Sequence, residues 1–192
     1  MVRLLLVIVL ILAVLVLVVF VLGYNKIRSA DVRVAEALSG IDVELTRRAA
    51  LIPSLVHTVQ TFAAHEKGIL DHVTDARTAL TSATSGKSVA ERSSAEQELD
   101  SALAPVLALG QSYPQLNSSN NFLNLQDNLA DTEGKLAFAR QYYNDLVTQY
   151  NTKQQVFPSN LLAGLFGFKP SEFFEVAEAE KALPRVNLSL SR

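Results

Sequence analysis

The residues best suited to metal-dependent chemistry are His57, His65 and His72, with Asp71 and Asp75 beside the last of them. On one continuous helix, His65 and His72 would lie about 20° apart, and His57 about 80° away. A helical metal site typically uses histidines at i and i+4 or a Glu-x-x-His motif, and this sequence has neither. We therefore expect solvated surface histidines. The alternative is a metal-dependent hydrolase that uses this His and Asp face of a second helix.

Other catalytic and nucleotide-binding motifs are also absent from the sequence. The chain has no cysteine, and therefore neither a thiolate nucleophile nor a disulfide. Gly86-Lys87-Ser88 resembles the end of a phosphate-binding loop, but Thr81 occupies the position of the required upstream glycine. With 17 Lys and Arg against 19 Asp and Glu, the chain lacks the positive charge that holds nucleic-acid phosphates. We expect no catalytic residue, cofactor, metal ion or nucleic-acid partner.

The most distinctive stretch is an apolar run, Leu4 to Leu22, that contains no charged or polar residue. As a helix it would be about 28 Å long, close to the thickness of a bilayer's hydrocarbon core. A cleaved signal peptide has a shorter apolar region and a small-x-small cleavage site, which Leu22-Gly23-Tyr24 does not provide. We therefore predict that residues 1–23 form an uncleaved transmembrane anchor, with the lipid bilayer as its partner.

The rest of the chain has the composition and spacing of long helices. Apolar residues separated by three and four predict helices over about 25–48, 53–80, 89–112 and 122–157. Leu129 and Leu136 lie in the middle of the fourth apolar stripe and should be buried, and Gly134 would let a neighbour approach closely. The predicted fold class is all-α: a transmembrane helix, an antiparallel up-and-down helical bundle over 24–157, and an apolar, aromatic segment over 158–192 that contains a short acidic helix (172–181).

Pro53 decides the number of helices in this prediction. Proline inside a helix loses a hydrogen bond and clashes with the preceding turn, whereas proline is favoured at the first helical position. We therefore expect a turn at Pro53, after which a second of four long helices folds back. The alternative is three helices, the first of them long and kinked, because the apolar spacing continues unbroken across Pro53.

Two groups of residues are candidates for binding a partner. Arg47 and Arg48, close to Pro53, could form a basic corner for a partner or simply complement the helix dipole. The apolar segment after the fourth helix could cover the core, dock at the membrane surface or bind a protein. With four helices this segment would emerge beside the membrane, and with three it would lie far from it. Its candidate residues are Phe157, Pro158, Asn160, Leu161, Leu162, Leu165, Phe166 and Phe168.

Three stretches resemble the LemA family of bacterial membrane-anchored proteins: GIDVELTRRAALIPSLV (40–56), ARQYYN (139–144) and FPSNLLAGLFGFK (157–169). The resemblance implies a single N-terminal transmembrane helix, an antiparallel helical bundle and a location in the bacterial inner membrane. It implies no enzymatic activity. Because members of this family are often encoded beside membrane metalloproteases, it favours a scaffold or adaptor for other membrane proteins, for example a membrane protease. Self-association is left open.

Basic residues around the apolar run favour one orientation in the membrane. Three of them, Lys26, Arg28 and Arg33, follow the run closely, whereas Arg3 alone precedes it. Positive residues collect on the cytoplasmic side of a span, so we expect the body of the protein in the cytoplasm.

If the apolar run is an uncleaved anchor, the mature protein keeps Met1 or Val2 and stays in the membrane pellet after alkaline carbonate extraction. Intact-mass measurement of the purified protein and immunoblotting of the two fractions test these outcomes. A mature terminus near Gly23 or Tyr24 would show that the run is removed as a signal peptide.

Overall fold

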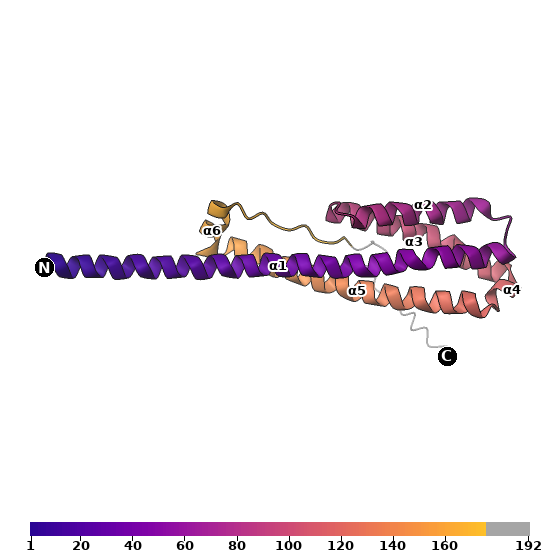
Figure 1. Ribbon diagram of the computed structural model, residues 1–192, viewed down its shortest axis with the longest axis horizontal. Coiled ribbons are helices and arrows are strands. Elements are labelled where there is room, and N and C mark those ends of the chain that lie inside the picture. Colours follow the sequence, from indigo (N-terminus) through magenta and orange to yellow (C-terminus); the bar gives the residue numbers. More distant parts are fainter. Residues whose placement is uncertain (176–192) are drawn as a thin grey trace, which may run out of the picture. The chain divides into compact units, whose positions relative to one another are not determined.

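The computed structural model describes residues 1–175, and all the regular secondary structure in that range is helical. This confirms the predicted all-α class, and the third long helix has the predicted bounds. The helices in chain order are α1 (Val2–Phe62), α2 (Lys67–Thr84), α3 (Val89–Ser112), α4 (Pro114–Asn117), α5 (Asn120–Gln155) and α6 (Ser159–Phe166) (Figure 1).

The helices divide into two compact units, which are described separately. The first unit contains residues 1–47 and 130–173, and the second contains residues 48–129 together with Phe174 and Glu175. Because α1 and α5 are long, each of them contributes one part to each unit.

In the first unit, α1 changes character at the end of the apolar run. Every side chain from Leu4 to Leu22 is exposed, so nothing in the described chain covers the run. Beyond it, the buried positions follow the spacing of an amphipathic helix. Ala37 is buried, whereas Leu38 beside it is only partly buried. The buried positions are Ile27, Ala30, Val34, Ala37, Ile41 and Leu45.

The apolar stripe predicted for the fourth long helix is confirmed in α5. Leu129 is 6% exposed and Leu136 is fully buried. Further along the same face, Tyr143 and Tyr150 are buried as well. Phe157, the last residue of the predicted stripe, lies beyond the end of α5 and is exposed.

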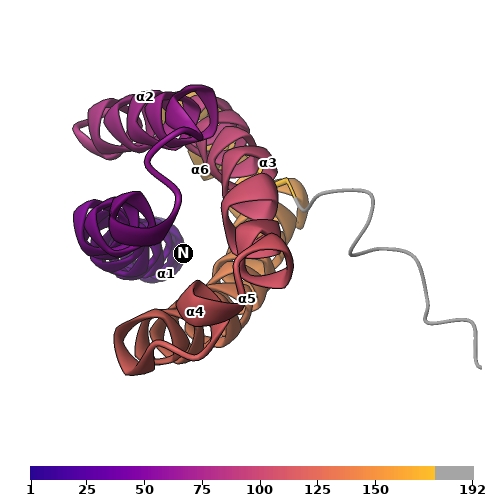
Figure 2. The ribbon, with the colours of Figure 1, turned by 90° about the vertical axis from the view of Figure 1, so that its right-hand side faces the viewer.

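In the second unit, α2 and α3 pack side by side (Figure 2). The sequence starts α3 with a capping box: the Glu91 N–H donates to Ser88 Oγ at 3.2 Å, and the Ser88 N–H donates to Glu91 Oε2 at 3.0 Å. Gly110, near the end of α3, makes room for Phe122 at the start of α5, since a Cβ there would lie 3.0 Å from the ring.

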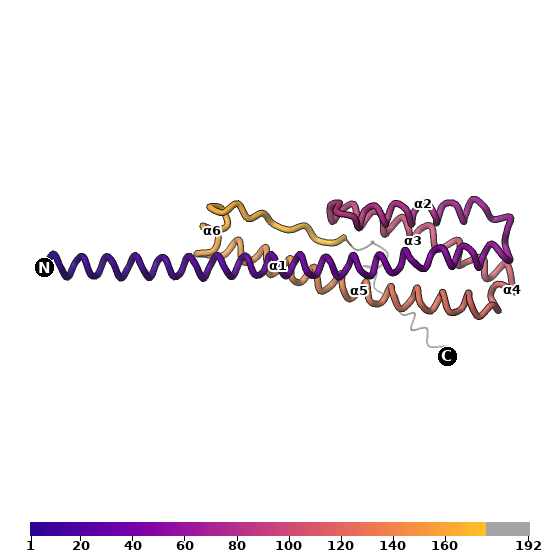
Figure 3. Tube along the Cα trace, in the orientation of Figure 1, coloured from indigo at the N-terminus to yellow at the C-terminus, as the bar shows by residue number. Residues whose placement is uncertain are grey.

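The predicted turn at Pro53 is wrong, because Pro53 lies inside α1. Proline has no N–H, so it leaves the carbonyl of Ala49 without its usual helical donor. That carbonyl instead accepts a hydrogen bond from Arg77 Nε on α2, at 3.0 Å. Because the lost bond is replaced, α1 continues to Phe62 and the chain reverses at residues 63–66 (Figure 3).

We expect Arg77→Met to lower the free energy of unfolding by about 1–2 kcal/mol, because the buried carbonyl of Ala49 loses its donor. In a Pro53→Ala background the loss should be smaller, because alanine restores the backbone N–H that the carbonyl needs. Urea unfolding of the full chain in detergent micelles, followed by circular dichroism, measures both values. Equal losses in the two backgrounds would show that Arg77 stabilises the fold in some other way.

Candidate functional site

The structure distributes the three histidines over different elements. His57 lies in α1, His65 in the turn after it and His72 on α2. The predicted common helical face of His65 and His72 is therefore wrong, because helix α1 ends before His65. Within residues 1–175, no group of three or more His, Cys, Asp or Glu side chains could hold a metal ion. The hydrolase alternative finds no supporting site in the described part of the chain.

Arg48 is a buried residue of the second unit, only 7% exposed. Its Nη2 lies 2.5 Å from Asp100 Oδ1 on α3, and its Nη1 lies 3.9 Å from Glu96 Oε1. Glu96 is itself 1% exposed. Buried charges are stable only when an opposite charge accompanies them, so this cluster joins α1 to α3. Arg48 serves the packing of the unit in this structure.

Arg47 has a different environment in the first unit. Its side chain is 48% exposed, and its Nη2 lies 3.8 Å from Asp131 Oδ2 on α5. Exposed ion pairs at such a separation contribute little to stability. Pro53 lines a pocket of the second unit with a volume of about 570 Å³, together with His57, Asn121 and Asn124. Of the two arginines, Arg47 alone presents its charge to solvent, and the structure does not form a basic corner from both.

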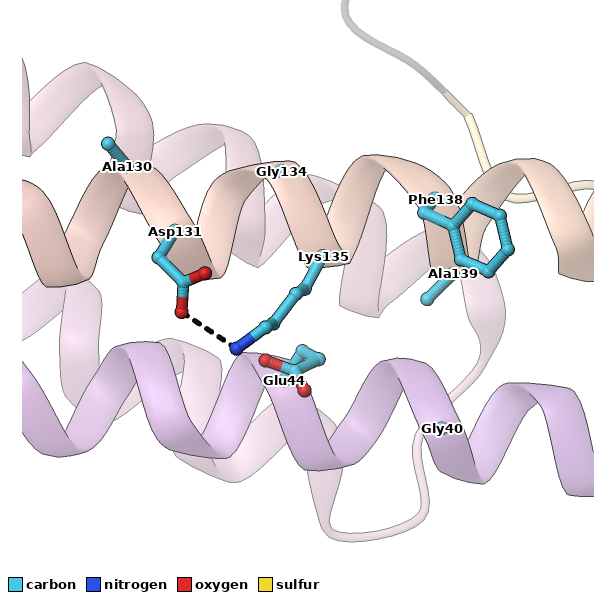
Figure 4. Close-up of a pocket in the computed structure, with 8 residues that line it drawn as sticks. All are labelled: Gly40, Glu44, Ala130, Asp131, Gly134, Lys135, Phe138 and Ala139. Atoms are coloured by element: carbon cyan, nitrogen blue, oxygen red, sulfur yellow. Dashed lines mark hydrogen bonds and ion pairs between the residues drawn. The ribbon is translucent and has the colours of Figure 1, made fainter.

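A groove between α1 and α5 in the first unit was not identified from the sequence. Its volume is about 550 Å³. A Cβ added to Gly40 or Gly134 would meet nothing within 4 Å, so the space beside both glycines is open. The expected close approach to Gly134 is therefore not made by any described residue. The α1–α5 groove is lined by Gly40, Glu44, Ala130, Asp131, Gly134, Lys135, Phe138 and Ala139 (Figure 4).

The rim of the α1–α5 groove combines an exposed aromatic ring with an ion pair. Phe138 is 73% exposed. Lys135 Nζ donates to Asp131 Oδ2 at 2.7 Å, and this bond lowers the pKa of the Asp131 carboxyl. The Asp131 carboxyl therefore stays ionised at neutral pH. The sequence did contain a signal for this surface. Phe138 lies two residues after Leu136, so it falls outside the apolar stripe and had to face away from the core.

The aromatic segment after α5 forms α6, which packs against α1 at the end of the apolar run. Leu162 and Ala163 are buried. A Cβ at Gly23 would lie 2.6 Å from Leu162 Cδ1, so any larger residue there would force the Leu162 side chain to shift. The Phe166 and Phe168 rings lie 4.8 Å and 5.8 Å from the Tyr24 ring.

The remaining candidates of the aromatic segment are at its surface. Phe157 is 79% exposed, and Pro158 precedes α6. The Asn160 side chain accepts a hydrogen bond from the Leu161 N–H at 3.0 Å. The exposed apolar side chains of α6 are Leu161, Leu165 and Phe166, at 56%, 71% and 55%.

Side chains of α5 hold the chain that follows α6. Asn151 Nδ2 donates a hydrogen bond to the carbonyl of Ser171 at 3.0 Å, and the Ser171 N–H donates one to Asn151 Oδ1 at 2.9 Å. The Tyr143 hydroxyl donates to the carbonyl of Glu172 at 2.9 Å. Because these groups bind α5, residues 172–175 are not helical, which corrects the start of the predicted acidic helix. The rest of that predicted helix lies outside the described residues.

Helix α1 carries the apolar run and continues directly into the helical units. The chain is therefore an all-α, membrane-associated protein. The described part of α1 is long and apolar enough to cross a bilayer. A family model named LemA family matches residues 37–188, and the chain therefore belongs to the LemA family. This confirms the resemblance seen in the sequence.

Curated relatives of this chain are magnetosome proteins. It is similar to MamQ 1 and MamQ 2 of Paramagnetospirillum magneticum (strain AMB-1), each 26% identical over 160 residues, covering 71% of this chain and 59% of the relative. MamQ of Magnetospirillum gryphiswaldense is 26% identical over 161 residues, covering 71% of this chain and 58% of the relative. The chain thus spans less than two thirds of the length of these relatives.

The two adjacent arginines provide a matched test of the assigned environments. Arg48→Met should lower the free energy of unfolding by about 3–5 kcal/mol, because it removes the buried cation that faces Glu96 and Asp100. Arg47→Met should change it by less than about 1 kcal/mol. Denaturant unfolding of the full chain in micelles measures both, and similar losses for the two variants would contradict the assignment.

Proposed function

We propose that this chain is a non-enzymatic, single-pass protein of the bacterial inner membrane that holds another membrane protein at the α1–α5 groove. The observation that carries the proposal is the continuity of α1. The helix that contains the apolar run reaches Gly40 in the groove without interruption, inside the same unit.

A continuous helix fixes the height of the groove above the membrane. At 1.5 Å per residue, Gly40 lies about 27 Å beyond Leu22. A flexible linker would instead let a soluble domain sample many positions and orientations. A binding surface at a constant height and direction suits a partner that is itself held in the membrane.

The chemistry of the groove suits a helix of the partner. The two open glycines allow a helix backbone to come close, as small residues do at other helix–helix contacts. Phe138, which is 73% exposed, offers apolar surface for the partner to bury. The Asp131–Lys135 ion pair gives the rim a fixed polar pattern that would orient the incoming helix.

The comparisons support a membrane function for the chain without naming its partner. The relatives are magnetosome proteins by name. The family resemblance makes a membrane metalloprotease one candidate partner. Lys26, Arg28 and Arg33 after the apolar run favour placing the helical units in the cytoplasm.

Site-specific photocrosslinking tests the proposal in native membranes. With benzoylphenylalanine at Phe138, the full chain should form a covalent adduct with another membrane protein, and with the same group at the exposed His72 it should not. Gly134→Leu fills the groove and should remove most of the adduct. Gly68→Leu is the matched control, because Gly68 is an equally open helical glycine that lies outside the groove.

Two outcomes would contradict the proposal. An adduct that forms equally well in the Gly134→Leu variant would show that the partner does not enter the groove. An adduct that contains only a second copy of this chain would replace the scaffold function with self-association. Both leucine variants should fold, because leucine is a better helix former than glycine and neither position has a close neighbour.

A further inference from the structure

We propose that α6 is an interfacial helix that lies in the headgroup boundary of the bilayer and inserts Leu161, Leu165 and Phe166 among the lipids. This inference rests on the membrane anchor of the proposed function, but not on the scaffold role or on the α1–α5 groove. The bilayer that receives α6 is the one that α1 enters, so a single membrane contacts two helices of the same unit.

Helix α6 lies against α1 at the end of the apolar run. Leu162 lies over Gly23, directly after the last residue of the apolar run. Phe166 reaches back along the run, where it lines an apolar recess of about 210 Å³ with Phe20, Val21 and Tyr24. If the run crosses the hydrocarbon core, this recess opens at the core's edge. Aromatic rings are enriched at that depth in membrane proteins.

Leu161 and Leu165 share one exposed apolar face of α6, and Phe166 lies about 100° further round, beside Tyr24 of α1. Leu161 and Leu165 lie about 40° apart on the helix, next to the face that carries Leu162 and Phe166. Asn160, about 100° from Leu161 and about 120° from Phe166, lies outside this apolar surface. In water, this short helix would expose three large apolar side chains together, whereas soluble proteins usually scatter such residues. At the boundary of the bilayer, the same face is covered by lipid.

The polar groups around α6 suit the interface rather than the hydrocarbon core. Gly167 ends the helix in a left-handed conformation with φ 70°, and the Phe168 N–H donates to the carbonyl of Ala163 at 3.0 Å. Two exposed lysines belong to the same unit: Lys26 is on α1, three residues after Gly23, and Lys169 follows Gly167 by two residues. Their ammonium groups match the charge of anionic lipid phosphates.

Both ends of α6 are fixed, so its apolar face keeps a constant direction. The helix begins shortly after α5 ends at Gln155, and the chain beyond it is bound to Asn151 and Tyr143. Gln154 Nε2 also donates to the carbonyl of Lys169, at 3.4 Å. α6 therefore meets the bilayer as a rigid element of the first unit.

Spin labels at single cysteines test this placement, since the native chain has none. The labelled full chain is reconstituted in vesicles of phosphatidylethanolamine and phosphatidylglycerol. Collision rates are measured with oxygen, which concentrates in lipid, and with a nickel chelate, which stays in water. Leu165→Cys is the test position. Phe138→Cys is the matched water control, because it is equally exposed, at 73% against 71%, in the same unit. Val14→Cys, in the middle of the apolar run, is the lipid control.

We expect the oxygen-to-nickel ratio at position 165 to exceed that at position 138 by about fivefold or more and to approach the ratio at position 14. Equal ratios at positions 165 and 138 would place α6 in water and overturn the inference. Protection of position 165 from both reagents would show that protein covers it, which also overturns the inference. Nickel access at position 14 would instead show that the anchor itself has failed, which separates that failure from a failure of α6 alone.

Discussion

The hydrogen bond from Arg77 to the carbonyl of Ala49 is the interaction on which the second unit depends. It lets α1 pass through Pro53, and so it decides where the chain turns. The turn at residues 63–66 is then held by α3, because the Tyr113 hydroxyl donates to Glu66 Oε1 at 3.1 Å. With that turn fixed, α2 lies along α3 and brings Arg77 to the carbonyl it serves. The local defect and the tertiary contact that corrects it therefore require each other.

The sequence predicted those features that neighbouring residues determine. The bounds of α3 were predicted correctly, and the structure adds that a capping box of Ser88 and Glu91 begins this helix. The stripe through Leu129 and Leu136 follows from helical spacing alone, and both residues are buried. The spacing also predicted an amphipathic helix after the apolar run, and α1 buries one face there.

The features that were missed depend on residues far apart in the sequence. Nothing near Pro53 indicates that Arg77 replaces its lost hydrogen bond, so local rules favoured a turn. The turn at residues 63–66 contains neither glycine nor proline. Its residues are compatible with a helix, so nothing in the sequence indicates a turn there. In the same way, Arg48 and its neighbour look alike until Asp100 and Glu96 are placed beside one of them. The α1–α5 groove required both of its helices to be positioned before Gly40 and Gly134 could be recognised as open.

Because α1 is one continuous helix, a change in the tilt of the proposed anchor moves the α1–α5 groove sideways. Transmembrane helices tilt by about 20° on average, and a span that is too long for its bilayer tilts further. For a point about 27 Å beyond the membrane boundary, a tilt of 20° corresponds to a sideways displacement of roughly 9 Å. That distance is close to the spacing between two packed helices. Local bilayer thickness, by changing the tilt of α1, would then move the groove into or out of reach of a neighbouring protein. The contacts within this protein would not change.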